Sequence, residues 1–185
     1  WPRTHGGLFK YFSWRTMQNS HHIAEAAFNS FARALREAGH DRISVAAYPE
    51  FHPESGSPAA DLDNLKRKID AGANGAITQY FYNADAYFRF RDACDKSGID
   101  VPITPGIMPI GNFFQISRFS EACGAEIPRW MRKRFEYFGD DRESVHSLSV
   151  ELVSGLCQRL LDNDVPGLHF YTMNRSHLVR RIWDN

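Results

Sequence analysis

The chain contains 185 residues, of which 22 are basic and 22 acidic, so its formal net charge is zero, and 43% of its residues are hydrophobic. That length and apolar content suit one domain with a single buried core. The balanced charge removes the usual electrostatic basis for a nucleic-acid or anionic-membrane partner. No apolar run approaches the length of a membrane-spanning helix and no signal-peptide layout is present, so we expect a soluble, cytoplasmic protein.

The cysteines and histidines give no sign of a disulfide framework or a metal site. Cys94, Cys123 and Cys157 form an odd total without a CxxC pair, which favours plain core thiols in a reducing compartment. Only His21 and His22 are close together, and no HExxH or zinc-type spacing occurs. There is also no GxSxG turn, so covalent catalysis has no candidate nucleophile.

The first 19 residues are rich in aromatic side chains but have neither helical nor strand periodicity. They begin with Trp1 rather than Met, from which we expect an upstream part to be missing. From Ser20 onward, apolar residues recur at three- and four-residue spacings, which predicts a helix. Ser20 suits its N-cap and Gly39 its C-terminal stop.

After Gly39 the chain alternates short apolar runs with helical segments. The predicted strands are 43–47, 75–81, 101–104 and 167–171, and the first is apolar enough to be buried on both faces. The predicted helices are 61 to about 71, 84–97, 113–122, 128–138, 142–162 and 174–184. Alternation of this kind predicts an α/β fold with a parallel sheet and right-handed crossovers.

Two architectures use this alternation: an open doubly wound sheet and a closed (β/α)8 TIM barrel. A dinucleotide-binding open sheet needs a GxGxxG turn, which is absent. A closed barrel needs eight βα units and about 250 residues, whereas about four units are present here. The chain is therefore either an open sheet or the C-terminal half of a barrel.

Polar and aromatic residues gather where the predicted strands end. In a βα barrel these ends share one rim, where active sites form. Strand-end loops are also polar in any soluble protein, and spacing alone does not separate the two interpretations. The residues concerned are Tyr48, Glu50 and His52 after the first strand, Gln79 after the second, Pro105 and Gly106 after the third, and Tyr171, Asn174 and Arg175 after the fourth.

The loop after the first predicted strand has an unusual composition. Prolines on both sides of His52 hold the segment from Tyr48 to Ser55 in extended or turn geometry. A rigid loop with Tyr and His suits packing against a flat heteroaromatic ligand. The alternative is a surface loop that proline merely stiffens.

The helix after this loop carries a polar and cationic face. Asp61, Asn64 and Lys68 lie at helical spacing on one side, with Arg67 beside them. Two cations and an amide near a strand end are suited to a phosphate or pyrophosphate. A solvated charged face is the alternative interpretation.

Seven strings, in one order along the chain, together resemble the bacterial methylenetetrahydrofolate reductase family. They are SVAAYPEFHPE (44–54), DLDNLKRK (61–68), DAGAN (70–74), AITQYF (76–81), PGIMP (105–109), IP (127–128) and HFYTMNR (169–175). The resemblance implies a (β/α)8 barrel with bound FAD. It further implies that NAD(P)H reduces the flavin, which then reduces 5,10-methylenetetrahydrofolate to 5-methyltetrahydrofolate, the methyl donor for methionine biosynthesis.

The resemblance also assigns site residues by position. Gln79 matches a glutamine that serves both folate and nicotinamide. Gln115 and Arg175 match folate-binding positions, and Phe119 matches an aromatic residue that packs on the substrate. The FAD-binding positions are Tyr48, His52, Ser55, Asp61, Asn64, Arg67 and Lys68.

Two of the family's strings are absent. The general acid of the family is a glutamate in a Phe-Glu-Phe-Phe-Pro-Pro context on the first barrel strand, and the fourth strand ends in Leu-Arg-Gly-Asp. The segment Phe135–Phe138 resembles the former only superficially, because it lies in a predicted helix. We therefore expect no catalytic residue in this chain, a poorly matching segment over 1–30 and a partial barrel domain over 31–185.

Three functional hypotheses follow. The first is a methylenetetrahydrofolate reductase without its upstream catalytic half, which takes a folate substrate and, through exposed strand edges, pairs with itself or with the missing half. The second is a non-catalytic flavin-binding or interaction remnant of the same fold. The third, an aldolase-like barrel, is disfavoured because Lys66 and Lys68 lie on a predicted helix rather than at a strand end.

Overall fold

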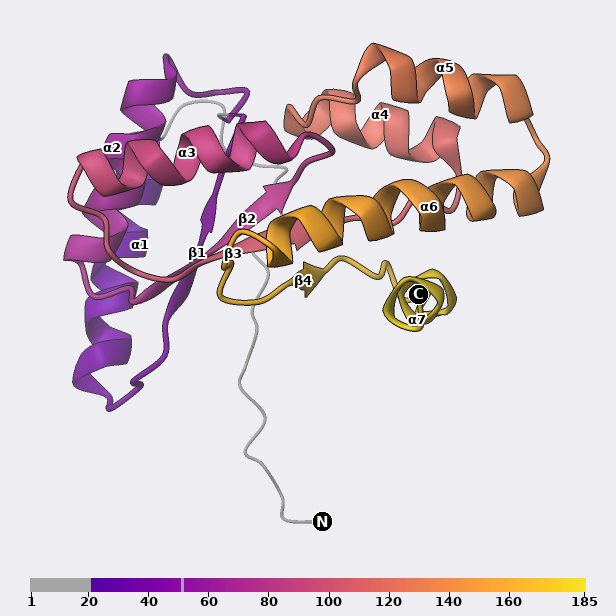
Figure 1. Ribbon diagram of the computed structural model, residues 1–185. Coiled ribbons are helices and arrows are strands. Elements are labelled where there is room, and N and C mark those ends of the chain that lie inside the picture. Colours follow the sequence, from indigo (N-terminus) through magenta and orange to yellow (C-terminus); the bar gives the residue numbers. More distant parts are fainter. Residues whose placement is uncertain (1–20, 51) are drawn as a thin grey trace.

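The computed structural model describes residues 21–50 and 52–185 and contains one parallel sheet. Its strands are β1 (Ser44–Ala47), β2 (Gly75–Tyr80), β3 (Ile103–Ile107) and β4 (His169–Phe170), and they lie side by side in chain order (Figure 1). All three pairings are parallel, with Ser44 opposite Gly75, Ala76 opposite Ile103 and Gly106 opposite His169. The predicted parallel α/β fold is confirmed, while the predicted N-cap at Ser20 lies outside the described residues.

Seven helices precede, connect or follow these strands within the described part of the chain. In Figure 1, α4 and α5 form a separate pair beyond the sheet, and the long α6 runs from that pair back toward β3 and β4. The helices are α1 (His21–Glu37), α2 (Pro58–Asp70), α3 (Ala84–Lys96), α4 (Phe113–Cys123), α5 (Arg129–Phe138), α6 (Arg142–Leu161) and α7 (His177–Trp183).

The sheet is covered on one face by the described elements. In β1, Val45 and Ala47 are buried whereas Ser44 and Ala46 are exposed, and in β2 buried residues alternate with half-buried ones. The prediction that the first strand is buried on both faces was therefore wrong for the described residues. The physical reason is that side chains alternate across a strand, and in β1 only the side that carries Val45 and Ala47 is packed into the core.

The buried side chains form two cores. The first lies between the sheet and its helices and includes Val45, Ala76, Phe81 and Leu160. The second lies among α4, α5 and the first half of α6, around Phe113. Tyr80, Tyr82, Met108 and Ile110, which follow or end β2 and β3, belong to the second core, so the strand ends join the two.

The third strand begins and ends later than its sequence pattern predicts. Its range is Ile103–Ile107 rather than 101–104, because Pro102 has no N–H to give to the ladder. The carbonyl of Pro102 still accepts a hydrogen bond from the Ala76 N–H at 2.9 Å. The strand then continues through Pro105 and Gly106.

The last strand and helix are shorter than predicted. The strand β4 covers only His169–Phe170, although the Tyr171 N–H adds one more bond to the Ile107 carbonyl at 2.8 Å. Helix α7 begins at His177 rather than at 174. Met173 and Asn174 have φ values of 48° and 59°, in the left-handed region that an α-helix does not use.

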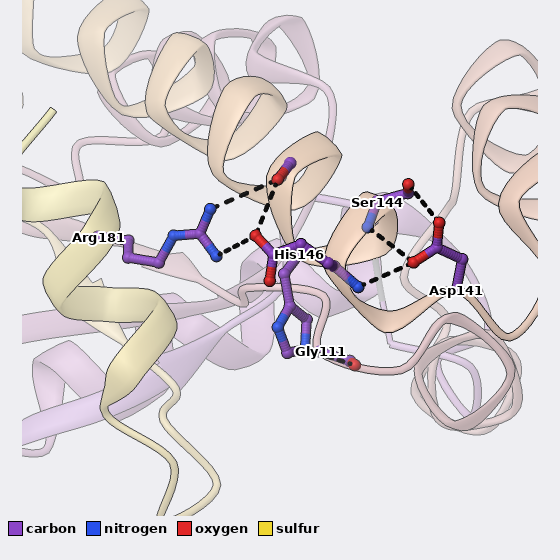
Figure 2. A network of polar contacts seen from close by, with 7 residues as sticks. Gly111, Asp141, Ser144, His146 and Arg181 are labelled. Atoms are coloured by element: carbon purple, nitrogen blue, oxygen red, sulfur yellow. Dashed lines mark hydrogen bonds and ion pairs between the residues drawn. The ribbon is translucent and has the colours of Figure 1, made fainter.

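A polar network at the start of α6 fixes its neighbours (Figure 2). Asp141 caps the helix by accepting from the backbone N–H groups of Glu143 and Ser144, and His146 Nε2 lies 3.2 Å from the Gly111 carbonyl oxygen. Arg181 of α7 pairs with Glu143 at 3.4 Å. The network thus ties α6 to the segment after β3 and to α7.

None of the helices in the described part of the chain combines the length and the apolar character needed to cross a membrane.

Candidate functional site

The loop after β1 and the end of β2 meet at the carboxyl edge of the sheet. We call this edge, with the segments that follow the four strands, the rim. Tyr48 and Gln79 were assigned to different ligands from sequence and line one small cavity, together with Glu50, Tyr80 and Cys123. The cavity measures about 10 Å³, the space of about one water molecule.

The loop after β1, residues 48–50 and 52–57, is held by its own polar groups and by α2. We call it the β1 loop. The His52 N–H donates to Asp61 Oδ2 at 2.9 Å, and the Glu54 N–H donates to His52 Nδ1 at 3.1 Å. The Ser55 hydroxyl donates to the Ser57 carbonyl at 3.0 Å, and Ser57 caps α2. These bonds fix the loop before any ligand is bound.

Tyr48 and His52 form an aromatic corner in this loop. Their ring centroids are 4.7 Å apart with the planes at 86°, and His52 is only 8% exposed. Because Nδ1 of His52 accepts the Glu54 N–H, the neutral ring carries its proton on Nε2, where it can donate. Burial raises the pKa of Tyr48 well above its usual value, so its phenol stays neutral and is a donor.

The two cations on the polar face of α2 contact different groups. Arg67 donates to the Oδ1 atom of Asn64, and the Lys68 ammonium lies 5.7 Å from the centre of the Phe28 ring on α1. Burial raises the pKa of Asp61, against the lowering effect of the His52 N–H bond. The predicted group of Asp61, Asn64, Arg67 and Lys68 therefore lies on the helix that anchors the β1 loop.

At Gly106, which has no side chain, strands β2 and β3 and the residue after β4 come into direct contact. We call this contact the Gly106 junction. The Gly106 N–H donates to the Thr78 hydroxyl at 2.8 Å, and the Tyr171 hydroxyl donates to the Thr78 carbonyl at 2.9 Å. A Cβ on Gly106 would lie 2.2 Å from that carbonyl oxygen and 2.7 Å from the Tyr171 ring. Only glycine fits here, and the close approach fixes the strand end from which Gln79 projects.

Aromatic rings continue from β2 onto α4. Phe119 stacks on Tyr80 with centroids 6.1 Å apart and planes at 14°, and the Tyr80 hydroxyl lies 2.9 Å from the Ser120 hydroxyl. Phe119 remains 44% exposed, and Gln115, one turn earlier, is also exposed. We call Gln115 and Phe119 the α4 face.

Arg175 lies in the turn after β4 and is exposed. Its backbone N–H donates to the Thr172 carbonyl at 2.8 Å, which closes the turn. Within the described residues no hydrogen bond joins its side chain to Gln115, so the two predicted folate positions are not directly linked. The left-handed residues before Arg175 set the course of this turn.

Sequence reasoning missed three contributors to the rim: Thr78, Tyr80 and Ser120. Thr78 and Tyr80 are buried on the side of β2 opposite Gln79, and the two-residue period of the strand contained that signal. No sequence signal shows that the Thr78 side chain bonds Gly106, because this depends on the irregular pairing between Ile77 and Tyr80.

The three cysteines differ in how deeply they are buried. Cys94 and Cys157 are buried free thiols, and burial raises their pKa values to about 12 and about 11, so they stay protonated. Cys123 is a partly buried free thiol beside the cavity, 3.4 Å from the Tyr80 hydroxyl. The described residues contain no group of three His, Cys, Asp or Glu side chains that could hold a metal ion.

Comparisons with known proteins give a consistent family. Residues 14–185 match the family model described as methylenetetrahydrofolate reductase. A stretch of 148 residues is 46% identical to 5,10-methylenetetrahydrofolate reductase of Escherichia coli (strain K12), covering 80% of this chain and 50% of that protein. The reductase of Buchnera aphidicola subsp. Schizaphis graminum is 46% identical over 140 residues, or 76% of this chain and 48% of that protein. The chain spans about half the length of the curated relatives it matches.

A solved structure shares the fold. It is an uncharacterized protein from Clostridium thermocellum that binds two copies of 5-methyl-5,6,7,8-tetrahydrofolic acid. The TM-score is 0.52, and the similarity covers 86% of this chain and 66% of that one. The sequences are 20% identical, so this likeness concerns the fold alone.

Proposed function

The chain belongs to the methylenetetrahydrofolate reductase family, as its sequence strings predicted, and from this premise we propose that it is the flavin- and folate-binding part of such a reductase. The reaction proposed is the reduction of 5,10-methylenetetrahydrofolate to 5-methyltetrahydrofolate by NAD(P)H through FAD. It would supply methyl groups for methionine biosynthesis in the cytoplasm.

The observation that carries the proposal is the meeting of three separate segments at the rim. Tyr48 of the β1 loop and Gln79 of β2 line one cavity, and the ring of Phe119 on α4 stacks on Tyr80 beside Gln79. These residues lie far apart in the sequence and were assigned to cofactor and substrate separately. A shared rim is what transfer between a flavin and a pterin requires.

The β1 loop and α2 suit FAD by the chemistry of their donors. The Tyr48 phenol and the His52 Nε2–H are directional donors beside aromatic faces, which fit a flat ring system. Arg67 and Lys68 on α2 bring positive charge suited to a pyrophosphate. When bound, FAD would accept a hydride from the nicotinamide and deliver it to the folate.

Gln79 and the α4 face suit the folate. The amide of Gln79 has both donor and acceptor atoms, so it can serve a pterin or a nicotinamide in turn. Phe119 is stacked on Tyr80 but keeps 44% of its surface exposed, which leaves room for a second flat ring. Arg175, exposed in the turn after β4, supplies a cation for a carboxylate.

The proposal places no catalytic acid within this chain. The FEYF segment that superficially resembles the family's acid string lies on α5, where Phe135 is buried in the second core and Glu136 is exposed. The residues here bind and orient cofactor and substrate, and the proton donor would come from the portion of the family barrel that this chain does not match. The four parallel strands are accordingly proposed to be half of a (β/α)8 barrel.

The first test measures flavin binding: the purified chain is titrated with FAD and its visible absorbance is recorded. A saturable spectral shift is expected. Arg67→Gln should lower the affinity for FAD at least about fivefold, because one charge-assisted contact is lost. Lys66→Gln is the matched control, because Lys66 pairs with Asp70 on the same helix. The absence of any spectral shift would contradict the proposed flavin site.

The second test separates a reductase from the alternative, a non-catalytic flavin-binding remnant. NADH or NADPH is added anaerobically to the flavin-loaded chain, and bleaching of the flavin spectrum is recorded. Bleaching followed by reoxidation with 5,10-methylenetetrahydrofolate supports the reductase. Flavin binding without bleaching supports the remnant, and gel filtration during the same work shows whether the chain associates with itself.

A further inference from the structure

Glu50 connects two segments that lie 76 residues apart in the sequence. Its Oε2 atom accepts a hydrogen bond at 2.8 Å from the backbone N–H of Glu126, in the segment between α4 and α5. Its Oε1 atom is buried and has no hydrogen-bond partner in the structure. The same side chain lines the cavity that Tyr48 and Gln79 also line. The hydrogen bond between Glu126 and Glu50 therefore joins the β1 loop to the segment that follows α4.

The surroundings of Glu50 favour a neutral carboxyl. Burial, with a smaller contribution from the Glu126 carboxylate, raises its pKa from 4.5 to about 7 against the lowering effects of the Glu126 N–H bond and of Arg89 on α3. The other titratable groups that face the carboxyl are Tyr80 on β2, Cys123 on α4 and Tyr48 in its own loop.

We propose that Glu50 is a positioning residue whose protonated carboxyl fastens the β1 loop to the segment after α4 and so sets the separation of the flavin and pterin sides of the rim. A neutral carboxyl keeps the acceptor for the Glu126 N–H and avoids leaving a buried negative oxygen without a donor. Ionisation would bury a negative charge and place it near the Glu126 carboxylate, and together these costs outweigh the stronger hydrogen bond that a carboxylate accepts from the Glu126 N–H, so the contact weakens.

The direction of the pH effect follows from proton linkage. Below about pH 4.5 the carboxyl is protonated whether the contact is made or broken, so the contact is fully stable. Between pH 4.5 and about 7 the free carboxyl loses its proton before the buried one does, and stability falls. Above about pH 7 both forms are ionised and the loss stays constant.

This inference deepens the proposed function, because it concerns the same rim, and its test therefore has one readout that needs no flavin. Thermal unfolding of the flavin-free chain is measured from pH 5 to pH 8 for wild type, Glu50→Gln and Glu126→Gln. The Glu50→Gln amide imitates the neutral carboxyl. Wild type is expected to lose roughly 3 °C or more relative to Glu50→Gln as the pH rises. Glu126→Gln removes a carboxylate that raises the pKa of Glu50, so that pKa should fall and the loss of stability should be complete at a lower pH than in wild type.

The second readout is FAD affinity at pH 5.5 and pH 8. The FAD affinity of wild type is divided by that of Glu50→Gln at each pH. This ratio is expected to be roughly fivefold lower at pH 8 than at pH 5.5. Only this difference between the two proteins is used, so effects of pH that both share cancel. Glu121→Gln, an exposed carboxylate on α4, is the control and should behave as wild type.

The dependence of stability on pH decides whether the proposed role of Glu50 is correct. A pH-dependent stability difference between wild type and Glu50→Gln supports the proposal, even if FAD fails to bind, in which case only the proposed function fails. Parallel pH profiles for the two proteins overturn it, because a merely structural Glu50 would shift stability equally at every pH. An unchanged profile in Glu126→Gln would likewise overturn the electrostatic basis of the contact.

Discussion

The β1 loop and the α4 face hold their polar groups by different means. In the β1 loop, side chains and backbone bond one another, His52 is buried and Asp61 on α2 anchors the backbone. On the α4 face, Gln115 and Phe119 project from a helix whose own backbone is satisfied, and both are exposed. One side of the rim is ordered by a local polar network, and the other by the packing of a helix beneath it.

The difference indicates what each side contributes to binding. A loop whose bonds are already made loses little conformational entropy when a ligand binds, so its substitutions should affect structure and affinity together. An exposed helix face contributes little to folding, so its substitutions should affect affinity with little loss of stability. Five substitutions test this contrast, two of them as a matched pair, from the largest expected effect to the smallest.

Gly106→Ala should damage both sides at once. The new methyl group would lie 2.2 Å from the Thr78 carbonyl oxygen, which is backbone and cannot move away cheaply. We expect a loss of about 3 kcal/mol or more in the free energy of unfolding, measured by urea denaturation. Gly155→Ala is the matched control, because Gly155 lies on an exposed position of α6 with nothing within 4 Å, and it should stabilise the chain by about 0.5–1 kcal/mol.

Asp61→Ala should affect mainly the β1 loop. It removes the acceptor of the His52 N–H, so we expect a loss of about 1–3 kcal/mol in unfolding free energy and at least tenfold weaker FAD binding. Asp61→Asn keeps an oxygen acceptor and should recover most of the stability. Equal effects of Asp61→Ala and of Asp63→Ala, at an exposed position of the same helix, would show that the anchor is unimportant.

Two helix caps allow a matched comparison of the two sides. Ser57 caps α2 by accepting from the Ala60 N–H, and Asn112 caps α4 by accepting from the Gln115 N–H. Replacement of either by alanine should cost about 1 kcal/mol of stability. The ligand affected should differ: FAD affinity for Ser57→Ala and folate affinity for Asn112→Ala, both measured by fluorescence titration. Loss of both affinities in both variants would remove the contrast.

Phe119→Ala should have the smallest effect on folding. The ring is 44% exposed and its main described contact is the stack on Tyr80, so we expect a loss of about 1 kcal/mol or less. Folate affinity should fall at least tenfold while FAD affinity stays within twofold. Phe119→Tyr, which retains the stacked ring, should bind folate nearly as well as wild type. A loss of stability above about 2 kcal/mol would place Phe119 in the core instead.

Much of the fold followed from the sequence because its signals are local. Apolar periodicity and a stop residue such as Gly39, which follows α1 with a φ of 85°, mark element ends through the geometry of one or two turns. The position of Gln79 near a strand end also follows, since the predicted strand 75–81 ends two residues after it and β2 ends at Tyr80. These features need no knowledge of what packs against the chain.

Other features depended on contacts between distant segments. The positive φ values of Met173 and Asn174 shorten the last helix; asparagine is enriched in the left-handed region, but methionine is not, and the sequence analysis extended the helix through Asn174. The buried side of β2 was visible as a pattern, but the bond from Thr78 to Gly106 depends on a pairing irregularity between two strands. The link from Glu50 to Glu126 is of the same kind, because 76 residues separate its two ends.

The bond from the Tyr171 hydroxyl to the Thr78 carbonyl has a consequence for synthesis on the ribosome. Its two ends are 93 residues apart, whereas β1, β2 and β3 pair with their sequence neighbours in the order in which they emerge. A nascent chain can therefore assemble three strands early, yet it cannot close the junction over Gly106 until residue 171 has left the exit tunnel. The site proposed for flavin and folate should consequently be completed late in translation, after β4 has emerged.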